Sequence, residues 1–419
     1  MDDKKQIMRL TKKGTGELIV NIVGSIGKIN IERFHDSTML ANYGNIEATL
    51  STPKEILVAI ETVKEEVEEL KGRDGLYVRG MIAAHELYTH ILNGEKVSYK
   101  KACKVMQQVE LKPVPQEQYN KVVRRINKKL EEMGYVGSVG DKVTKWLADT
   151  AIPADQVIAT SDSLLHNSKK ATLDKIISLP KEDGIDAVYP IQGVHWSGSS
   201  RYLGGFRGDL TFNVECPWST PTFASIMCHE GYPGHQAFYC HWDDLFQQGK
   251  LPLEAAYYST TGNPATAMFE GAPEMGLHFL GWDDLEEDTP EVTEEEKKLF
   301  ALGRDVLDLR RMIQMQACYM YHVDDVMEVD VVKYILNSQL FTEVEARNTI
   351  RFFTHPVQRY YYPAYYYGRW MIGKAYDKIP KGKRTEFFHF LYDLPHTNET
   401  FCKGIEEMIG QEFKPFDYV

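Results

Sequence analysis

The sequence lacks any run of the ~18 apolar residues that a membrane span needs, and its N-terminal stretch MDDKKQIMRLTKKG has no apolar segment of a secretory signal. The six cysteines are scattered and form no CxxC pair, which favours reduced core thiols over a disulfide framework. Basic residues are also in deficit, because 48 Lys and Arg face 60 Asp and Glu for a formal net charge of −12. We therefore expect a cytoplasmic protein that neither binds membranes nor takes nucleic acid as its main partner.

The composition, 43% hydrophobic and 26% charged over 419 residues, is that of an ordinary globular enzyme. A Thr-Pro-Lys-Glu start at Thr52 predicts a helix that ends near Gly72, and further helices are predicted over residues 116–133 and 160–179. Residues 17–34, rich in Ile and Val, predict a hairpin instead. We expect a mainly α fold with a helical N-terminal lobe (residues 1–185) and a catalytic lobe (residues 186–419), or one continuous domain.

The chemistry concentrates in the stretch FASIMCHEGYPGHQAFYCHW, where His229 and Glu230 are followed six residues later by His235. His-Glu-x-x-His on a helix offers two imidazoles to a zinc ion and a carboxylate to the attacking water. Six residues along a straight helix turn by roughly 120° away from alignment, so these histidines could not share an ion there. Pro233 and Gly234 between them predict a break or bulge that brings the rings together. The alternative is a helix that simply ends at Pro-Gly, with two unrelated histidines.

A second stretch, His85-Glu86-Leu87-Tyr88-Thr89-His90, imitates this motif. Its histidines are five residues apart, about 140° around a helix, and no Pro or Gly separates them. We expect it to form a structural helix without a metal.

A zinc ion held by two histidines needs a third protein ligand, commonly a carboxylate from a neighbouring helix. Glu270 and Glu274, one helical turn apart, are the candidates. Upstream, residues 209–214 alternate like a strand, and residues 198–208 are rich in Gly and Ser. We expect residues 210–214 to form the strand that edges the cleft and pairs with substrate, and residues 198–208 to cover it.

The heptapeptide HEGYPGH resembles the His-Glu-x-x-Pro-Gly-His signature of a bacterial family labelled domain of unknown function 885, whose members are regarded as zinc metallopeptidases. The resemblance covers residues 189–373 and is weak before them. It implies a large helical, zincin-like metallopeptidase fold with a small β element edging a deep active-site cleft, distantly similar to thimet oligopeptidase and carboxypeptidase Taq.

The resemblance also bears on the third ligand. Phe269-Glu270-Gly271 matches the beginning of the family's next segment, whereas Ala272-Pro273 departs from it and Leu277 stands where the family has a second Glu. This implies Glu270 as the zinc ligand. Glu274 is left as a supporting or substrate-binding residue.

Three further elements of the resemblance lie downstream. The family has a His near an Arg-rich helix, which implies His322 as a catalytic candidate, with a core histidine as the alternative. Tyr365 begins a Tyr-x-x-Gly turn that the family also has, and its phenol could stabilise an oxyanion. Arg359 and Tyr366, in the same aromatic stretch, are candidate substrate-binding residues, although most of these tyrosines should only pack helices.

These features predict a zinc-dependent peptidase that binds one Zn²⁺ through His229, His235 and Glu270, with Glu230 as the general base. Its expected substrate is a peptide or a small amide. Two alternatives stay open: a zinc amide hydrolase for a non-peptide substrate, and a catalytically silent binding protein of the same fold. The sequence leaves terminal or internal cleavage, side-chain preference and oligomeric state undecided.

Overall fold

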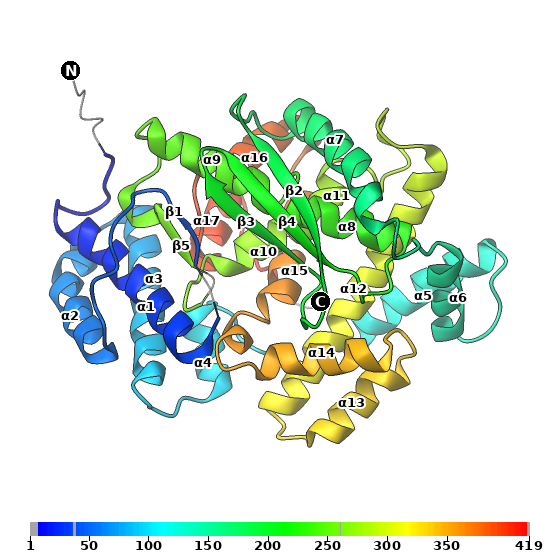
Figure 1. Ribbon diagram of the computed structural model, residues 1–419, viewed down its shortest axis with the longest axis horizontal. Coiled ribbons are helices and arrows are strands. Elements are labelled where there is room, and N and C mark those ends of the chain that lie inside the picture. The colour runs from blue at the N-terminus through cyan, green and yellow to red at the C-terminus, as the bar shows by residue number, and fades with distance from the viewer. Residues whose placement is uncertain (1–6, 37–38, 260, 417–419) are drawn as a thin grey trace.

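The computed structural model describes residues 7–36, 39–259 and 261–416. It confirms the mainly α fold, with 61% helix, 7% strand and no closed barrel. One end of the molecule holds the first four helices, α1 (Thr15–Phe34), α2 (Pro53–Glu69), α3 (Gly72–Leu92) and α4 (Tyr99–Met106) (Figure 1). The other end holds the next two helices, α5 (Gln116–Glu132) and α6 (Val139–Asp149).

The middle of the chain carries the strands and the motif helices. It comprises α7 (Val157–Lys175), β2 (Gly184–Ile191), β3 (Gly198–Gly204), β4 (Arg207–Asn213), α8 (Thr220–Glu230), α9 (His235–Gln247), η1 (Leu253–Ala255), β5 (Tyr257–Ser259), α10 (Thr266–Glu274) and α11 (Gly276–Phe279). A further strand, β1 (Met39–Asn42), lies between α1 and α2 in the chain and pairs with β5.

The C-terminal part is again helical. It comprises α12 (Glu294–His322), α13 (Glu328–Asn337), α14 (Glu343–Thr354), η2 (Gln358–Tyr360), α15 (Ala364–Lys378), η3 (Lys381–Lys383), α16 (Arg384–Asp393) and α17 (Asn398–Ile409). The long helix α12 runs beneath the centre of the molecule, beside α8 and α15 (Figure 1).

The hairpin expected over residues 17–34 is wrong, because this stretch forms α1. Its buried side chains Ile19, Ile22, Val23 and Ile26 recur at the spacing of one helix face. The β-branched composition suggested strands, but burial of this face against the neighbouring helices outweighs the modest helix penalty of Ile and Val. Gly24 fits the same packing, because a Cβ there would lie 3.1 Å from the Tyr257 ring.

The central sheet has the order β2-β4-β3, with β2 and β4 parallel and β3 and β4 antiparallel. The strand expected near residues 209–214 exists as β4, but it is central and cannot be the edge that faces the cleft. That edge is β3. The expected flexible cover, residues 198–208, is therefore an ordered hairpin, whose turn places Gly204 and Gly205 at φ 83° and 58°.

The second motif-like stretch, His85 to His90, is confirmed as part of a structural helix, α3. His85 is fully buried, and its Nδ1 lies 2.6 Å from the carbonyl oxygen of Met81. His90 instead contacts Glu95 at the end of the helix, with Nδ1 2.5 Å from Oε1. The two rings thus serve different local contacts, as their angular separation predicts.

The hydrophobic core is continuous across the domain boundary that the sequence predicts at residue 185. One cluster of buried side chains extends from Ile19 to Phe413 and includes residues of both expected lobes. The boundary stays a prediction. Among the described residues, no helix is both long and apolar enough to span a membrane.

Helices α10 and α15 cross more closely than side chains would permit. A Cβ on Gly368 would lie 1.9 Å from the carbonyl oxygen of Ala267, and one on Gly271 would lie 2.3 Å from the carbonyl carbon of Gly368. Backbone therefore packs on backbone at this crossing. Because Glu270 belongs to α10, the crossing also fixes the position of a candidate ligand.

We expect Gly368→Ala to destabilise the fold by about 3 kcal/mol or more, since the methyl group would force the two backbones apart. Gly373→Ala is the matched control on α15, because its Cβ would meet only the flexible end of Met275 at 3.4 Å. The control should be neutral or stabilising by about 0.5–1 kcal/mol. Urea denaturation measures both, and equal stabilities would contradict the close crossing.

We also expect acid to weaken the fold through His85. Burial lowers the pKa of His85 from its ordinary 6.5 to about 4, and its Nε2 has no hydrogen-bond partner among the described residues. The unfolded chain therefore takes up this proton first, and stability falls as the pH drops from 6.5 towards 4. We expect His85 to account for a loss of about 2 kcal/mol in the free energy of unfolding between pH 7 and pH 4.5. Urea denaturation at both pH values should show this loss missing in His85→Leu, and an unchanged difference would exclude His85 as its source.

Candidate metal centre

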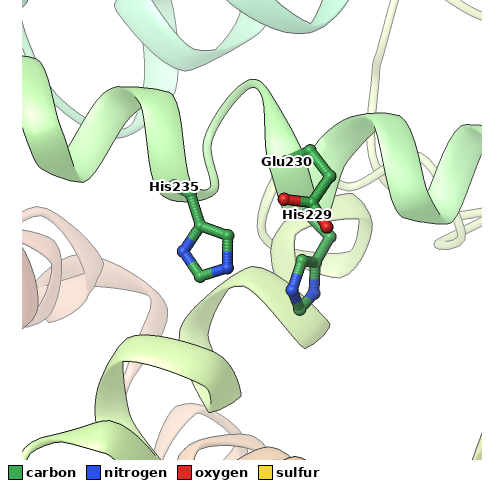
Figure 2. Close-up of side chains that lie close together, drawn as sticks. All are labelled: His229, Glu230 and His235. Carbon is green, nitrogen blue, oxygen red and sulfur yellow. The ribbon is translucent and has the colours of Figure 1, made fainter. Parts of the chain in front are cut away.

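The predicted break in the motif is present between α8 and α9. Helix α8 starts at Ser219 with a capping box and Pro221 in its first turn, and it ends at Glu230. Helix α9 begins at His235, and the Tyr232-Pro233 bond between the helices is cis. Figure 2 shows His229 and His235 on either side of the loop with both imidazole rings directed to the same side.

The break is held by close backbone packing. A Cβ on Gly234 would lie 1.8 Å from the carbonyl oxygen of His229, so only glycine allows α9 to start against the end of α8. Tyr392 of α16 donates its hydroxyl to the Pro233 carbonyl at 2.8 Å.

A buried carboxylate ties both flanks of the break to the sheet. Asp183, just before β2, accepts hydrogen bonds from Tyr232 Oη at 3.1 Å, Gln236 Nε2 at 3.2 Å and Cys240 Sγ at 3.1 Å. Lys169 of α7 balances its charge at 2.8 Å. Because these donors come from the loop and from α9, Asp183 fixes where His235 can lie.

Three buried donors converge at the break. Glu270 Oε2 lies 3.4 Å from His229 Nε2 and 3.6 Å from His235 Nε2. Within the described part of the chain, this oxygen has no hydrogen-bond partner. Donor atoms of His229, Glu230 and His235 also lie within 4.8 Å of one another. The structure thus brings together all four residues that the sequence singled out for the centre.

Glu274 occupies a different place from Glu270. Its Oε1 lies 3.4 Å from Nδ1 of His229, the ring atom opposite the cluster. Arg311 of α12 donates to Glu274 through Nε at 3.0 Å and through Nη2 at 2.5 Å. Glu274 therefore stands behind His229, beside an Nδ1 atom that has no hydrogen-bond partner among the described residues.

The three carboxyl groups differ in their electrostatics. Burial raises the pKa of Glu270, but His235 and His229 outweigh it and lower the value to about 2. Burial acts on Glu274 too, and Arg311 lowers its pKa overall. Burial raises the pKa of Glu230 to about 7, which Glu270 and Glu274 reinforce against the effect of His235. Such divergence between neighbouring acids is typical of a site that separates a general base from permanent anions.

Tyrosines line the same space. The ring of Tyr365 lies 6.3 Å from that of His229, with the Arg311 guanidinium 5.0 Å from its centroid. Burial, followed by the Glu230 and Glu270 charges, also raises the pKa of Tyr239 and Tyr361. These two phenols were missed from the sequence. Tyr239 could have been found, because it follows His235 by one helical turn.

The sheet edge also reaches the cluster. The backbone of Ser200 on β3 faces the Glu230 carboxylate closely enough to lower its pKa, against the larger effect of burial. A Cβ on Gly198 would lie 3.2 Å from Glu230 Oε1. Residues two apart on a strand point their backbone groups the same way, so Gly198 presents its N–H and C=O along this free edge beside Glu230.

Three further predicted residues, His322, Arg359 and Tyr366, are not among the described lining residues of the cavity beside the cluster, and their roles stay predictions. His322 is half-buried: its ring stacks on Tyr99 at 3.9 Å, its Nε2 lies 2.6 Å from the Phe353 carbonyl oxygen, and burial lowers its pKa to about 4. Arg359 packs over Tyr360, with its guanidinium 4.6 Å from the ring centroid. Tyr366 packs against Trp370. The sequence could not rank these candidates, because only tertiary packing decides which side of the aromatic stretch faces the cluster.

A cavity of about 690 Å³ opens beside the cluster. His229, Glu230 and Tyr365 lie at its inner end. Its walls come from α6 and the segment after it, from the loop before β3, from α8, from α12 and from α14. This volume falls within the about 300–1,000 Å³ of typical small-ligand sites.

Comparison with known proteins gives a fold relationship alone. No protein-family model and no curated protein matches the sequence. A solved structure described as a "putative lipoprotein" from Colwellia psychrerythraea is similar with a TM-score of 0.58 and 14% identity, over 85% of this chain. This chain spans 66% of that protein's length. A second, described in the same words and as of unknown function, from Shewanella oneidensis, has a TM-score of 0.47 and 13% identity, over 86% of this chain and 73% of that one.

These comparisons correct the expected membership of the domain of unknown function 885 family. No family model supports it, and the similar structures are described only as lipoproteins. A seven-residue motif can recur on unrelated chains, because the geometry it produces is local. What the chain can do therefore has to be argued from its own residues.

We expect Gly234→Ala to disrupt the centre, because its methyl group would collide with the His229 carbonyl. The loss should be about 1–3 kcal/mol of stability or more, with the separation of the two histidines increased. Gly382→Ala is the control, since a Cβ there meets nothing within 4 Å. Thermal unfolding and a crystal structure of each variant would test this. Wild-type stability in the Gly234→Ala variant would show that the contact is not as close as described.

Proposed function

We propose that the protein is a zinc-dependent peptidase with His229, His235 and Glu270 as metal ligands and Glu230 as general base. The observation that carries the proposal is the spacing of Glu270 Oε2 from one nitrogen of each histidine. Ligands about 2.0–2.1 Å from a tetrahedral ion lie about 3.3–3.4 Å apart. The 3.4 Å and 3.6 Å separations agree with this spacing and are too long for good hydrogen bonds.

The chemistry of the donor set also fits zinc. Two imidazoles and one carboxylate, with a coordination position left open, form a recurring catalytic zinc site. Glu270 Oε2 is buried without a hydrogen-bond partner among the described residues, which is costly unless a cation occupies the centre. Glu274 supports His229 from behind, as carboxylates commonly do for zinc-bound histidines.

The surrounding residues then have separate roles in the reaction. When bound, zinc would polarise the scissile carbonyl and lower the pKa of water towards about 7. Glu230 accepts a proton from the attacking water on its carboxylate and donates it to the leaving amine. The Ser200 backbone faces this carboxylate at the free edge of β3, where Gly198 can pair with the substrate backbone. Tyr365, and with it Tyr239 or Tyr361, offers a phenol to the developing oxyanion.

A peptide is favoured over a small amide because an extended strand edge borders the base. The sequence-based expectation of a cytoplasmic location is retained here as a proposal only. A non-peptide amide hydrolase and a silent binding protein remain the competing functions, and the experiment below separates both from a peptidase.

Three isosteric substitutions in one pocket test the proposal: Glu270→Gln, Glu274→Gln and Glu230→Gln. We expect zinc affinity to fall by more than about 100-fold in Glu270→Gln and by about 10–100-fold in Glu274→Gln, which loses only ring orientation. Glu230→Gln should bind zinc as the wild type does but lose about 10²–10⁴-fold or more in peptide hydrolysis. Zinc competition titration and a mixed peptide library, before and after chelation, provide the measurements.

The outcomes separate the competing functions. Full zinc affinity in Glu270→Gln would exclude it as a ligand, and wild-type turnover in Glu230→Gln would exclude it as the base. Zinc binding without hydrolysis of any peptide, but with cleavage of small amides, would favour the amide hydrolase. Zinc binding with neither activity would favour a silent binding protein.

A further inference from the structure

The charged residues of the cavity point to the substrate. Apart from the centre itself, its charged lining consists of Glu274, Arg310, Arg311 and Glu345. Arg311 is paired with Glu274 at 2.5 Å and also donates to Gln314 at 3.1 Å. Arg310 is paired with Glu345 at 2.6 Å and donates to the Leu340 carbonyl at 2.9 Å.

Each arginine already faces a partly buried carboxylate, so a substrate anion would have to compete with that negative charge. The Arg310 guanidinium also lies flat on Phe341, 4.2 Å from its ring centroid. Burial lowers the pKa of His195 at the cavity wall, and its Nε2 lies 2.6 Å from Gln358 Oε1. A free C-terminal carboxylate would therefore find no unpaired cation among the described lining residues, and burying it there would be costly.

The cavity also lacks a suitable partner for the free N-terminal ammonium group of a substrate among its described lining residues. Carboxylates that capture a substrate ammonium must be unpaired and close to the scissile bond. Of the acidic residues in the described lining, Glu274 and Glu345 are already bound to arginines. Only Glu230 remains, and it is assigned to proton transfer.

The remaining walls are largely apolar. They bring indole, phenyl and branched aliphatic groups from four separate elements to one space. Trp218 follows β4, Ile226 lies one turn before Glu230 on α8, and Leu307 lies on α12. Apolar surface of this kind binds by removing side-chain carbon from water.

We propose, resting on the peptidase function above, that the cavity takes an uncharged, bulky apolar stretch of a peptide and that cleavage is internal. The few apolar residues next to the scissile bond occupy the cavity, and both charged termini stay outside it. The protein is thus an endopeptidase for short apolar segments rather than an aminopeptidase or a carboxypeptidase.

Binding can be measured separately from hydrolysis in the Glu230→Gln protein loaded with zinc. The probes are acetylated, amidated hexapeptides with Leu-Phe at the centre, the same peptides with Glu-Glu or Lys-Lys there, and Leu-Phe dipeptides with free termini. By calorimetry we expect the blocked apolar peptide to bind about tenfold or more tighter than each of the others. Tighter binding of a charged centre or of a free dipeptide would overturn the proposal.

A cavity-filling pair of variants locates the binding. Ala148 is exposed on α6 and lines the cavity, whereas Lys145 is exposed on the same helix and lies outside the described lining. In the same Glu230→Gln background, Ala148→Trp should weaken binding of the blocked apolar peptide by about tenfold or more, and Lys145→Trp should leave it unchanged. Equal binding by both variants would overturn the cavity as the binding place.

The wild-type protein then decides the cleavage position by mass spectrometry of products. Internal cuts in the blocked peptide support the proposal, and release of single residues from free-ended peptides alone overturns it. If the blocked peptide binds as expected but is never cut, the peptidase function fails while the occupant of the cavity stands.

Discussion

The centre depends on one steric constraint, the contact between the backbone of Gly234 and the carbonyl end of α8. Two histidines six residues apart meet only if the helix between them stops and restarts at an angle. The contact leaves no room for a side chain at residue 234, so the angle between α8 and α9 requires glycine at this position. Asp183 and Tyr392 then hold the two flanks of the break from opposite sides, through the sheet and through α16. The distance between His229 and His235 is thus set by packing from several elements.

The same pocket shows how environment assigns roles to identical side chains. Glu230, Glu270 and Glu274 are all buried, yet the positive partners of each differ. Glu270 faces two imidazoles, Glu274 is held by Arg311, and Glu230 has His235 as its main cationic neighbour, opposed by the charges of Glu270 and Glu274. Cationic partners keep two of them ionised, while burial favours the protonated form of the third. This division supports the proposed base more directly than the fold does, because a shared fold leaves function open.

Local rules were sufficient where the decisive contacts are local. The Thr52 helix start is present as a capping box, and the break at Pro233 and Gly234 follows from backbone sterics. The same rules failed over residues 17–34, where composition was given more weight than the helical spacing of the apolar side chains. They also gave β4 the wrong position, at the edge of the sheet instead of its centre. The order of strands depends on pairing between distant segments, which local sequence patterns do not specify.

The sequence by itself therefore singled out His229, Glu230 and His235, through their spacing around Pro233 and Gly234, and left Glu270 and Glu274 as the candidates for a third ligand. Only the tertiary structure decided what surrounds them. It placed Glu274 between His229 and Arg311 of α12, it stacked His322 on Tyr99, and it made β3 the exposed edge beside Glu230. The reason is physical: helical period and proline sterics act within a few residues, whereas side-chain partners and sheet edges are chosen by contacts between distant segments.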